Sequence, residues 1–283
     1  MLNLHQVSLT HNGAQLLEDI TLACPAGSLT ALIGPNGAGK STLLGLMAGD
    51  RLPSQGELRL EGRSIAEYSV RDLAARRAVM PQDNVLRFAY RVDEVVAMGR
   101  ALRDLPPNED DACIAKAMAD VEILHLASRD AMTLSGGEQA RTTFARVRVQ
   151  EASLLLLDEP TAALDLRHQE RLLQLAAQWA SRGHCVVAVM HDLNLAAAHA
   201  DRLVLLDQGR LVAQGTPWQV LEQQRLSRVY RQPVCVMSHP HRHCPVVVTT
   251  HHAHAPHDAL EPQEPLESHD FLEPQASPEK APS

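Results

Sequence analysis

The chain has 283 residues, of which 45 % are hydrophobic and 3 % aromatic, and its formal net charge is −8. This length suits one large domain or two small ones, with a core built mainly from Leu, Val and Ala. A membrane-spanning helix is excluded because no apolar run approaches ~18 residues. A body close to neutral gives no basis for nucleic-acid binding, so no nucleic-acid partner is expected.

The N-terminus and the cysteines predict the compartment. The first ten residues, MLNLHQVSLT, lack the basic start and apolar stretch of a signal peptide. The five cysteines are scattered, without the close pairs that metal sites use. We therefore expect a cytosolic protein with reduced thiols.

Four continuous apolar runs are typical of parallel strands that are buried on both faces. They are residues 29–33, 154–158, 185–190 and 202–206. Between the second and third runs, residues 168–181 carry apolar side chains at helical spacing and end before Gly183. This strand–helix–strand order predicts an α/β fold.

Two segments depart from this alternation of strands and helices. Residues 84–150 contain three helical patterns and no strong strand, which predicts a helical subdomain inserted between strands of the core. From residue 239 the chain becomes rich in His, Pro and Glu, with eight of the fifteen histidines. We therefore expect a domain over 1–238 and a tail over 239–283 that is largely disordered.

The histidines of the tail allow two interpretations. HPHRHC and HHAHAPH could bind haem iron, Zn²⁺ or Ni²⁺, because imidazole and thiolate are ligands for all three. The alternative is a solvated, low-complexity extension in which the histidines are incidental.

GPNGAGKST, residues 34–42, has the spacing of a phosphate-binding loop. It follows the strand predicted over 29–33 and opens a helix, which is the context such a loop requires. Its backbone N–H groups would surround the β-phosphate, Lys40 would reach the β- and γ-phosphates, and Ser41 would ligate Mg²⁺. Lysine is rare here, with only three in the chain, which argues against an incidental surface lysine.

Two acids follow the four leucines at 154–157. Asp158 at the strand tip could hold Mg²⁺ directly or through water. Glu159, one residue further, is the natural base to polarise an attacking water. A strand that simply ends in polar residues is the alternative interpretation of this motif alone.

Three further polar residues carry weaker signals. His191 follows the run 185–190 and could contact the γ-phosphate, although a loop histidine is the default interpretation. Gln82 follows another strand-like stretch, and Asp165 in AALD could carry an acid toward a partner.

The stretch LSGGEQAR, residues 134–141, places two adjacent glycines where a helix begins. Glycine costs about 0.8–1.0 kcal/mol relative to alanine inside a helix. A Ser-Gly-Gly start offers bare backbone N–H groups and the positive end of a helix dipole, which suit an anion. The sequence therefore predicts a second phosphate-contacting element at residues 135–137.

In the order of these motifs the chain resembles the ATP-binding subunits of ABC transporters over about residues 1–238. The resemblance implies an α/β phosphate-loop ATPase core with a mixed sheet, flanking helices and an N-terminal antiparallel β part. It also implies the inserted helical subdomain and the C-terminal tail.

The resemblance assigns roles to individual residues. Glu159, His191 and Gln82 would be catalytic, and Ser41, Gln82 and Asp158 would hold Mg²⁺. In that family the residues 135–137 of one subunit cover ATP bound by the other subunit of a head-to-tail dimer. The implied nucleotide contacts are Gly34, Pro35, Asn36, Gly37, Ala38, Gly39, Lys40, Ser41, Thr42, His11, Ser135, Gly136, Gly137 and Asp165.

Two residues depart from the family pattern. His11 stands where an aromatic residue usually stacks on the adenine, which predicts looser nucleotide selectivity. Arg148 stands where small or apolar residues are usual, and the sequence offers no explanation for it.

Finer resemblance points to the ATPases of haemin importers. It rests on VDEVVAMGR, LDLRHQ, the stretch from His191 to Leu221, and RVYRQPVCV. This implies an ATPase homodimer on the cytoplasmic face of the cell membrane, two separate permease subunits, and indirectly a periplasmic or surface haem-binding protein. The alternatives are a ferric-siderophore or cobalamin importer subunit and, more distantly, a soluble regulatory ATPase without a permease.

Overall fold

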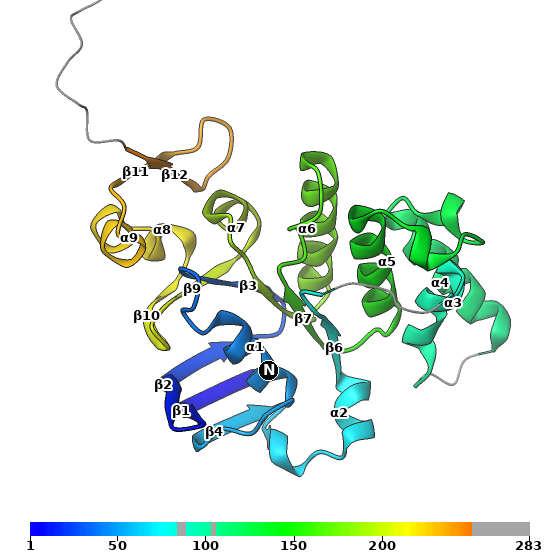
Figure 1. Ribbon diagram of the computed structural model, residues 1–283, viewed down its shortest axis with the longest axis horizontal. Helices are drawn as coiled ribbons and strands as arrows, with labels where there is room; N and C mark the ends of the chain where they lie inside the picture. The colour runs from blue at the N-terminus through cyan, green and yellow to red at the C-terminus, as the bar shows by residue number, and fades with distance from the viewer. Residues whose placement is uncertain (84–88, 103–105, 251–283) are drawn as a thin grey trace, which may run out of the picture. The chain divides into compact units, whose positions relative to one another are not determined.

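The predicted apolar runs form the centre of a six-stranded sheet in the computed structural model, which describes residues 1–83, 89–102 and 106–250 (Figure 1). The strand order is β10-β9-β3-β8-β7-β6, and all neighbours are parallel except β9 and β10. The strands are β3 (Ser28–Ile33), β6 (Arg77–Met80), β7 (Leu154–Asp158), β8 (Cys185–Val189), β9 (Arg202–Asp207) and β10 (Arg210–Gly215). The mixed α/β fold expected from the sequence is confirmed.

Alternate side chains of each central strand enter two different cores. In β7, Leu155 and Leu157 join one cluster, whereas Leu154 and Leu156 join the other, and all four are fully buried. Fully burying a leucine side chain contributes about 1.5–3 kcal/mol, so both faces of the sheet stabilise the fold. This explains why these strands read as unbroken apolar runs.

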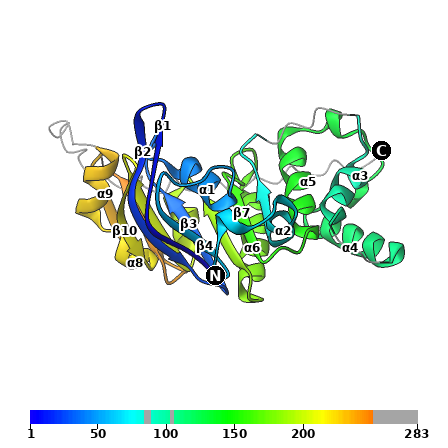
Figure 2. The same cartoon turned by 90° about the horizontal axis from the view of Figure 1, so that it is seen from below.

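An antiparallel sheet and one helix cover one face of the central sheet (Figures 1 and 2). The sheet has the order β2-β1-β4-β5, which confirms the expected N-terminal antiparallel part. Its elements and the neighbouring helices are β1 (Leu2–His11), β2 (Ala14–Cys24), α1 (Lys40–Ala48), β4 (Gln55–Leu60), β5 (Arg63–Ser64), η1 (Ile65–Glu67) and α2 (Val70–Arg76).

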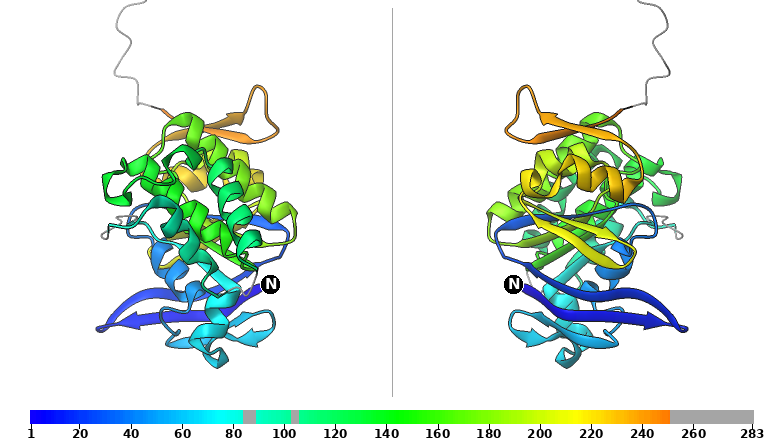
Figure 3. Two further views of the ribbon diagram at one scale, coloured as in Figure 1. Left: turned by 90° about the vertical axis from the view of Figure 1, so that its right-hand side faces the viewer. Right: turned by 90° about the vertical axis from the view of Figure 1, so that its left-hand side faces the viewer.

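The described part of residues 84–150 is helical, and these helices pack on one another at one end of the central sheet (Figures 1 and 3). Phe144, fully buried, lies in the core that they share with that sheet. The elements are α3 (Val92–Ala97), η2 (Met98–Arg100), α4 (Pro107–Asp120), η3 (Leu124–Leu126), η4 (Ala131–Thr133) and α5 (Gly136–Val149).

The remaining helices lead to a C-terminal β-hairpin, which stands above them in Figure 3. They are α6 (Leu166–Ser181), α7 (Leu193–His199), α8 (Pro217–Val220) and α9 (Gln223–Tyr230), followed by β11 (Val234–Ser238) and β12 (Pro245–Thr249). In the described part of the chain, no helix is both long and apolar enough to cross a membrane.

The predicted tail boundary at residue 239 falls inside this hairpin. Residues 245–249 pair with β11, and Asn194 exchanges two hydrogen bonds with the backbone of Val247, at 2.7 and 3.2 Å. Arg242 also bonds Glu170 of α6. The apolar stretch PVVV within a polar segment therefore extends the folded unit to Thr250. The prediction of disorder for 251–283 concerns residues outside the described ones.

Candidate functional site

The loop over residues 34–42 connects β3 to α1, as the motif requires. Lys40 begins the helix, is 6 % exposed, and donates from Nζ to the carbonyl oxygens of Gly34 at 2.8 Å and Pro35 at 3.0 Å. Burial lowers the pKa of Lys40, while the nearby Glu159 and Asp158 carboxylates oppose that shift. The loop thus holds the buried Lys40 ammonium against its own backbone carbonyl groups.

Gly34 is held against two elements from the C-terminal half of the chain. Its φ is 146°, and a Cβ there would lie 2.2 Å from the carbonyl oxygen of Leu206 in β9. Burial raises the pKa of Tyr230, at the end of α9, to about 12, and a hydrogen bond with the Gly34 backbone opposes that rise. No motif or spacing in the sequence indicates that Tyr230 contacts the loop.

Ser41 and Asp158 meet although 117 positions separate them. The Ser41 hydroxyl donates to Asp158 Oδ1 at 3.1 Å. Burial raises the pKa of Asp158, and the Ser41 hydrogen bond partly opposes it. A hydroxyl and a carboxylate oxygen are ligands that Mg²⁺ takes, so this pair fits a magnesium ion beside bound phosphates.

Glu159 and His191 also lie in contact. His191 Nε2 is 2.5 Å from Glu159 Oε1, and the Glu159 side chain is 13 % exposed. Glu159 has a positive φ of 49°, rare for a non-glycine residue, and its N–H donates to Val189 at 3.2 Å. The turn after β7 is therefore fixed by β8, so that the acid faces the histidine.

One cleft of about 360 Å³ brings most of these groups together. Its lining is Leu16, Asn36, Gly37, Gly39, Lys40, Ser41, Thr42, Glu159 and His191. Pro35 and Ala38 belong to the same loop, and Asp158 reaches it through Ser41.

His11 and Gln82, like residues 135–137 and Asp165, lie outside the described lining of this cleft. His11 pairs with Ala14 at the end of the β1–β2 hairpin, and the lining includes Leu16 instead, which sequence reasoning missed. Gln82 follows the end of β6 at Met80. The roles assigned to His11 and Gln82 stay predictions.

Ser135 caps the helix that follows it. Its hydroxyl accepts from the Glu138 N–H, while Glu138 Oε2 accepts from the Ser135 N–H at 2.7 Å and from its hydroxyl at 2.8 Å. These hydrogen bonds lower the pKa of Glu138. The reciprocal cap places the Glu138 carboxylate at the start of α5 and satisfies the N–H groups of Ser135 and Glu138.

The two glycines lie beside the turn that follows β7. A Cβ on Gly137 would lie 3.1 Å from the carbonyl oxygen of Ala163, whereas one on Gly136 would come no closer than 3.7 Å to Ala163 Cβ. The structure therefore brings residues 135–137 next to the AALD segment that ends in Asp165.

Asp165 caps α6. Its Oδ1 accepts from the His168 N–H at 2.9 Å and lies 2.7 Å from His168 Nδ1. These contacts lower the pKa of Asp165. His168 belongs to the stretch LDLRHQ, whose spacing does not predict this contact.

Arg148, unexplained by the sequence, pairs with Asp120 at the end of α4. Its side chain is 14 % exposed and that of Asp120 is 24 % exposed. The pair fastens the last turn of α5 to the last turn of α4, which explains a cation where an apolar residue was expected.

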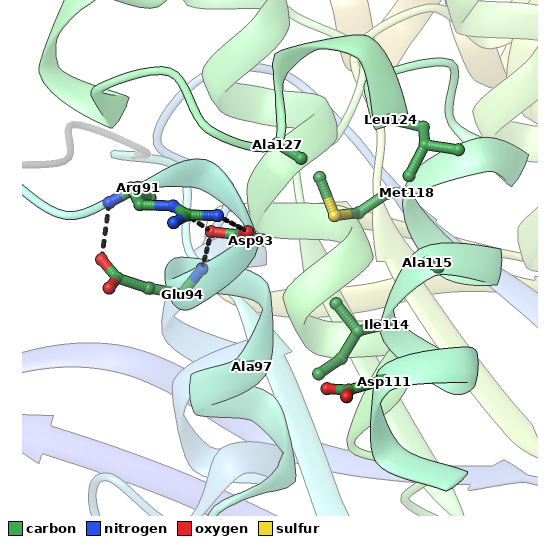
Figure 4. A pocket seen from close by; sticks show the side chains of 10 residues that line it. All are labelled: Arg91, Asp93, Glu94, Ala97, Asp111, Ile114, Ala115, Met118, Leu124 and Ala127. Atoms are coloured by element: carbon green, nitrogen blue, oxygen red, sulfur yellow. Dashed lines mark hydrogen bonds and ion pairs between the residues drawn. The ribbon is translucent and has the colours of Figure 1, made fainter. Parts of the chain in front are cut away.

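A second cleft of about 430 Å³ lies within the helical subdomain (Figure 4). Ile114 and Met118 of α4 point into it, and Arg91 on the opposite wall bonds Asp93 and Glu94. Asp111 adds a further acid at its rim. The cleft is thus apolar with an acidic border.

The histidine-rich stretch HPHRHC adds no metal site of three or more ligands to the described structure. Residues 239–244 form the turn of the C-terminal hairpin, where His239 Nδ1 accepts two backbone N–H groups. Within the described ranges, no group of three His, Cys, Asp or Glu residues could hold a metal ion. HHAHAPH lies outside the described residues.

Comparison with known proteins shows similarity to ATP-binding proteins of ABC transporters. The family model described as "ABC transporter" matches residues 17–162. The hemin import ATP-binding protein of Nocardia farcinica is 51 % identical over 80 % of this chain and 79 % of its own. That of Thermobifida fusca is 44 % identical over 88 % of each chain.

Solved structures agree on the fold. A chain titled as an inward-facing putative metal-chelate type ABC transporter is similar with a TM-score of 0.74 and 27 % identity. The similarity covers 89 % of this chain and 98 % of that chain.

Proposed function

Because this chain belongs to the ABC transporter family, as an ATP-binding protein, we propose that it hydrolyses ATP to drive haem import through separate membrane subunits. The observation that carries the proposal is the single cleft that joins Lys40 and Ser41 to Glu159 and His191. The names of the relatives supply the cargo, because an ATPase subunit does not itself touch what is transported.

ATP binding falls to the loop over 34–42. The Lys40 ammonium would exchange the Gly34 and Pro35 carbonyl oxygens for the β- and γ-phosphates. Ser41 and Asp158 would hold Mg²⁺, which neutralises phosphate charge when bound. Gln82 is the proposed additional ligand, and His11 the proposed platform for the adenine.

Hydrolysis falls to Glu159 and His191. Glu159 acts as the base that polarises the attacking water, and His191 orients it toward the γ-phosphate. Their contact in the described structure supports this division, because it holds the carboxylate beside the loop. A positioned base of this kind typically contributes ~10²–10⁴-fold to the rate.

Two copies complete each other's sites. Ser135, Gly136 and Gly137 would contact the γ-phosphate of ATP bound by the partner, and Asp165 would face the same interface. The start of α5 supports this role, because the Ser135–Glu138 cap uses the N–H groups of those two residues and not those of Gly136 and Gly137.

The cleft in Figure 4 is the proposed contact for the membrane subunits. Its apolar floor and its acids Glu94 and Asp111 suit an apolar segment flanked by a basic residue, whereas Asp93 is already paired with Arg91. The protein would then lie on the cytoplasmic face of the cell membrane, with a periplasmic or surface haem-binding protein delivering cargo from the other side.

Growth on haem as the only iron source tests the function. A strain lacking this gene and any other haem uptake route would be complemented with the wild type, Lys40→Ala or Lys116→Ala. Lys116 is an exposed lysine of α4 and serves as the matched control. We expect growth with the wild type and Lys116→Ala, and none with Lys40→Ala.

Other outcomes have defined meanings. If the deletion strain grows normally on haem but not on a ferric siderophore or with cobalamin as a required nutrient, the cargo is that compound. If it grows under all these conditions, the import function is wrong, and a regulatory ATPase without a permease becomes the better description.

A further inference from the structure

The C-terminal hairpin is bonded to the start of α7, the helix that follows His191. Its strand β12 packs against this helix (Figure 1). The side-chain amide of Asn194, in the first turn of α7, accepts from the Val247 N–H at 2.7 Å and donates to the Val247 carbonyl oxygen at 3.2 Å. One side chain thus pairs with both backbone groups of a single strand residue.

The pairing of the hairpin strands leaves both backbone groups of Val247 for this contact. The Thr250 N–H donates to the Pro233 carbonyl oxygen, so these two residues form a bonded pair. Bonded and unbonded pairs alternate in an antiparallel ladder, which makes Val236 and Val247, three pairs further along, an unbonded pair. The N–H and carbonyl of Val247 therefore point away from β11, and Asn194 satisfies both.

These bonds to the hairpin lie close to His191 along the chain. Asp192 caps α7, because its Oδ1 accepts from the N–H groups of Asn194 at 2.8 Å and Leu195 at 3.0 Å. Only Asp192 and Leu193 separate His191 from Asn194. A helix of seven residues depends on tertiary contacts for its stability. A shift of its first turn would therefore move the backbone that carries His191.

The imidazole of His191 depends on that backbone for its place in the cleft. Its side chain is 46 % exposed, so packing does little to fix the ring. The hydrogen bond that the structure describes for the ring is the one with Glu159 Oε1, at 2.5 Å. The position of the turn before α7 therefore decides whether the ring meets Glu159 beside the phosphate loop.

We propose that Asn194 is a positioning residue of ATP hydrolysis, which holds the turn that carries His191 to the C-terminal hairpin. The proposal rests on the proposed function, because His191 needs this placement only if the cleft hydrolyses ATP. Asn194 does not belong to the described lining of the cleft, so it acts through His191. The hairpin, which contains none of the nucleotide-binding motifs, thereby takes part in turnover.

The hairpin has other anchors besides this contact. Val234 and Cys244 are buried in the core, at 6 % and 8 % exposed. Arg242 in the turn donates to both carboxylate oxygens of Glu170 in α6, each at 3.2 Å. We therefore expect the hairpin to stay docked when the Asn194 amide is removed. Arg242→Ala is a matched control, because it breaks a different contact of the same hairpin.

Two substitutions remove the contact from opposite sides. Asn194→Ala removes the amide. Val247→Pro removes the N–H that donates to it, and an edge strand tolerates proline where the ladder does not use that N–H. Val236→Pro is the control for the second variant, because it places proline at the paired position of the other strand and leaves the Asn194 contact in place.

Steady-state ATPase rates of the full-length proteins test the positioning role. We expect Asn194→Ala and Val247→Pro to lower kcat about two- to tenfold, as suits the loss of one or two hydrogen bonds, with KM for ATP unchanged. Val236→Pro and Arg242→Ala should keep the wild-type kcat. Equal kcat in all five proteins would overturn the positioning role and leave the ATPase assignment standing. A raised KM, or an equal loss in the control variants, would also overturn it.

A mutant cycle with His191 tests the route of the effect. His191→Ala is compared with the double variant that also carries Asn194→Ala, in single turnovers with the enzyme in excess. We expect both to hydrolyse ATP at the same lowered rate, because Asn194 then has no imidazole to position. A further loss in the double variant, or a wild-type rate in His191→Ala, would overturn the proposal.

Melting temperatures separate positioning from loss of stability. Asn194→Ala and Arg242→Ala each remove a contact of the hairpin, so we expect both to melt below the wild type while only the first loses kcat. A kcat that falls in step with the melting temperature in both variants would overturn the positioning role. A wild type without ATPase activity would overturn the proposed function, and with it the positioning role.

Discussion

Glu159 and His191 meet across two neighbouring strands, with His191 Nε2 2.5 Å from Glu159 Oε1. The strands are β7 and β8, in which Asp158 pairs directly with Val189, so both residues follow the same edge of the sheet. The contact is therefore set by the register of two buried strands, while the side chains themselves line the cleft beside Lys40.

Glu159→Gln should separate binding from turnover. The amide keeps the size of the side chain but cannot act as a base, so we expect ATP to bind as in the wild type and the rate to fall ~10²–10⁴-fold. Nucleotide titration and steady-state ATPase assays measure the two effects. A variant that keeps more than half of the wild-type rate would exclude Glu159 as the base.

Gly136→Ala should impair the shared site while leaving the subunit folded. The new Cβ would come no closer than 3.7 Å to Ala163, which is ordinary contact, and alanine is better in a helix than glycine by up to about 1 kcal/mol. We expect an unchanged or higher melting temperature, and an ATPase rate at least about tenfold lower, equivalent to 1.4 kcal/mol in the barrier.

Gly45→Ala is the control for that variant. Gly45 lies within α1, and a Cβ there would meet no atom within 4 Å. Its ATPase rate should match the wild type. Similar losses in Gly136→Ala and Gly45→Ala would indicate a general effect of helix stiffening and contradict the role of residues 135–137.

Asp158→Asn should stabilise the nucleotide-free protein at neutral pH. Burial raises the pKa of Asp158, so the folded state holds the proton more tightly than the unfolded state. The stability that this gives is present below the ordinary aspartate pKa of about 3.9 and is lost as the pH rises through the raised pKa. Asparagine carries no charge at either pH, so the variant does not lose this stability as the pH rises.

The measurement is the melting temperature of wild type and Asp158→Asn at two pH values. We expect the variant to melt higher near pH 7, by about 2–4 °C for each kcal/mol relieved, and the difference to vanish near pH 4. ATPase activity with Mg²⁺ should be lost at the same time. A variant that is less stable at pH 7 would show that the Ser41 contact outweighs the burial of the charge.

Arg148→Ala should destabilise the fold without changing the cleft that contains Lys40 and Glu159. The Arg148–Asp120 pair is mostly buried, and losing one partner of a charged hydrogen bond costs about 1–3 kcal/mol. Denaturant unfolding measures this for Arg148→Ala, Asp120→Ala and the double variant. Strictly additive losses would show that the pair contributes no coupling energy.

The sheet and the phosphate loop could be predicted because their signals are local. Runs such as 154–158 need only their own side chains to indicate a strand buried on both faces. The loop over 34–42 is recognisable because a strand comes directly before it and a helix directly after it. The same holds for α6, whose apolar spacing identified it.

The missed contacts are those between distant, ordinary residues. Nothing around Tyr230 indicates that it reaches Gly34, and no spacing indicates that His168 stands between Asp165 and Glu122. Arg148 looked anomalous because Asp120, which lies 28 positions earlier, explains it only in three dimensions. The hairpin was missed because polar composition masked the short PVVV strand.

Because Gly34 lies so close to Leu206, the backbone of β9 helps to set the shape of the nucleotide loop, although no chemistry is assigned to that strand. A mutational scan of the chain should therefore show a second intolerant stretch over residues 205–209, far from any motif. Substitutions there that enlarge or shift the backbone would damage ATP binding as severely as changes within the loop, and would be misread as folding defects unless affinity were measured.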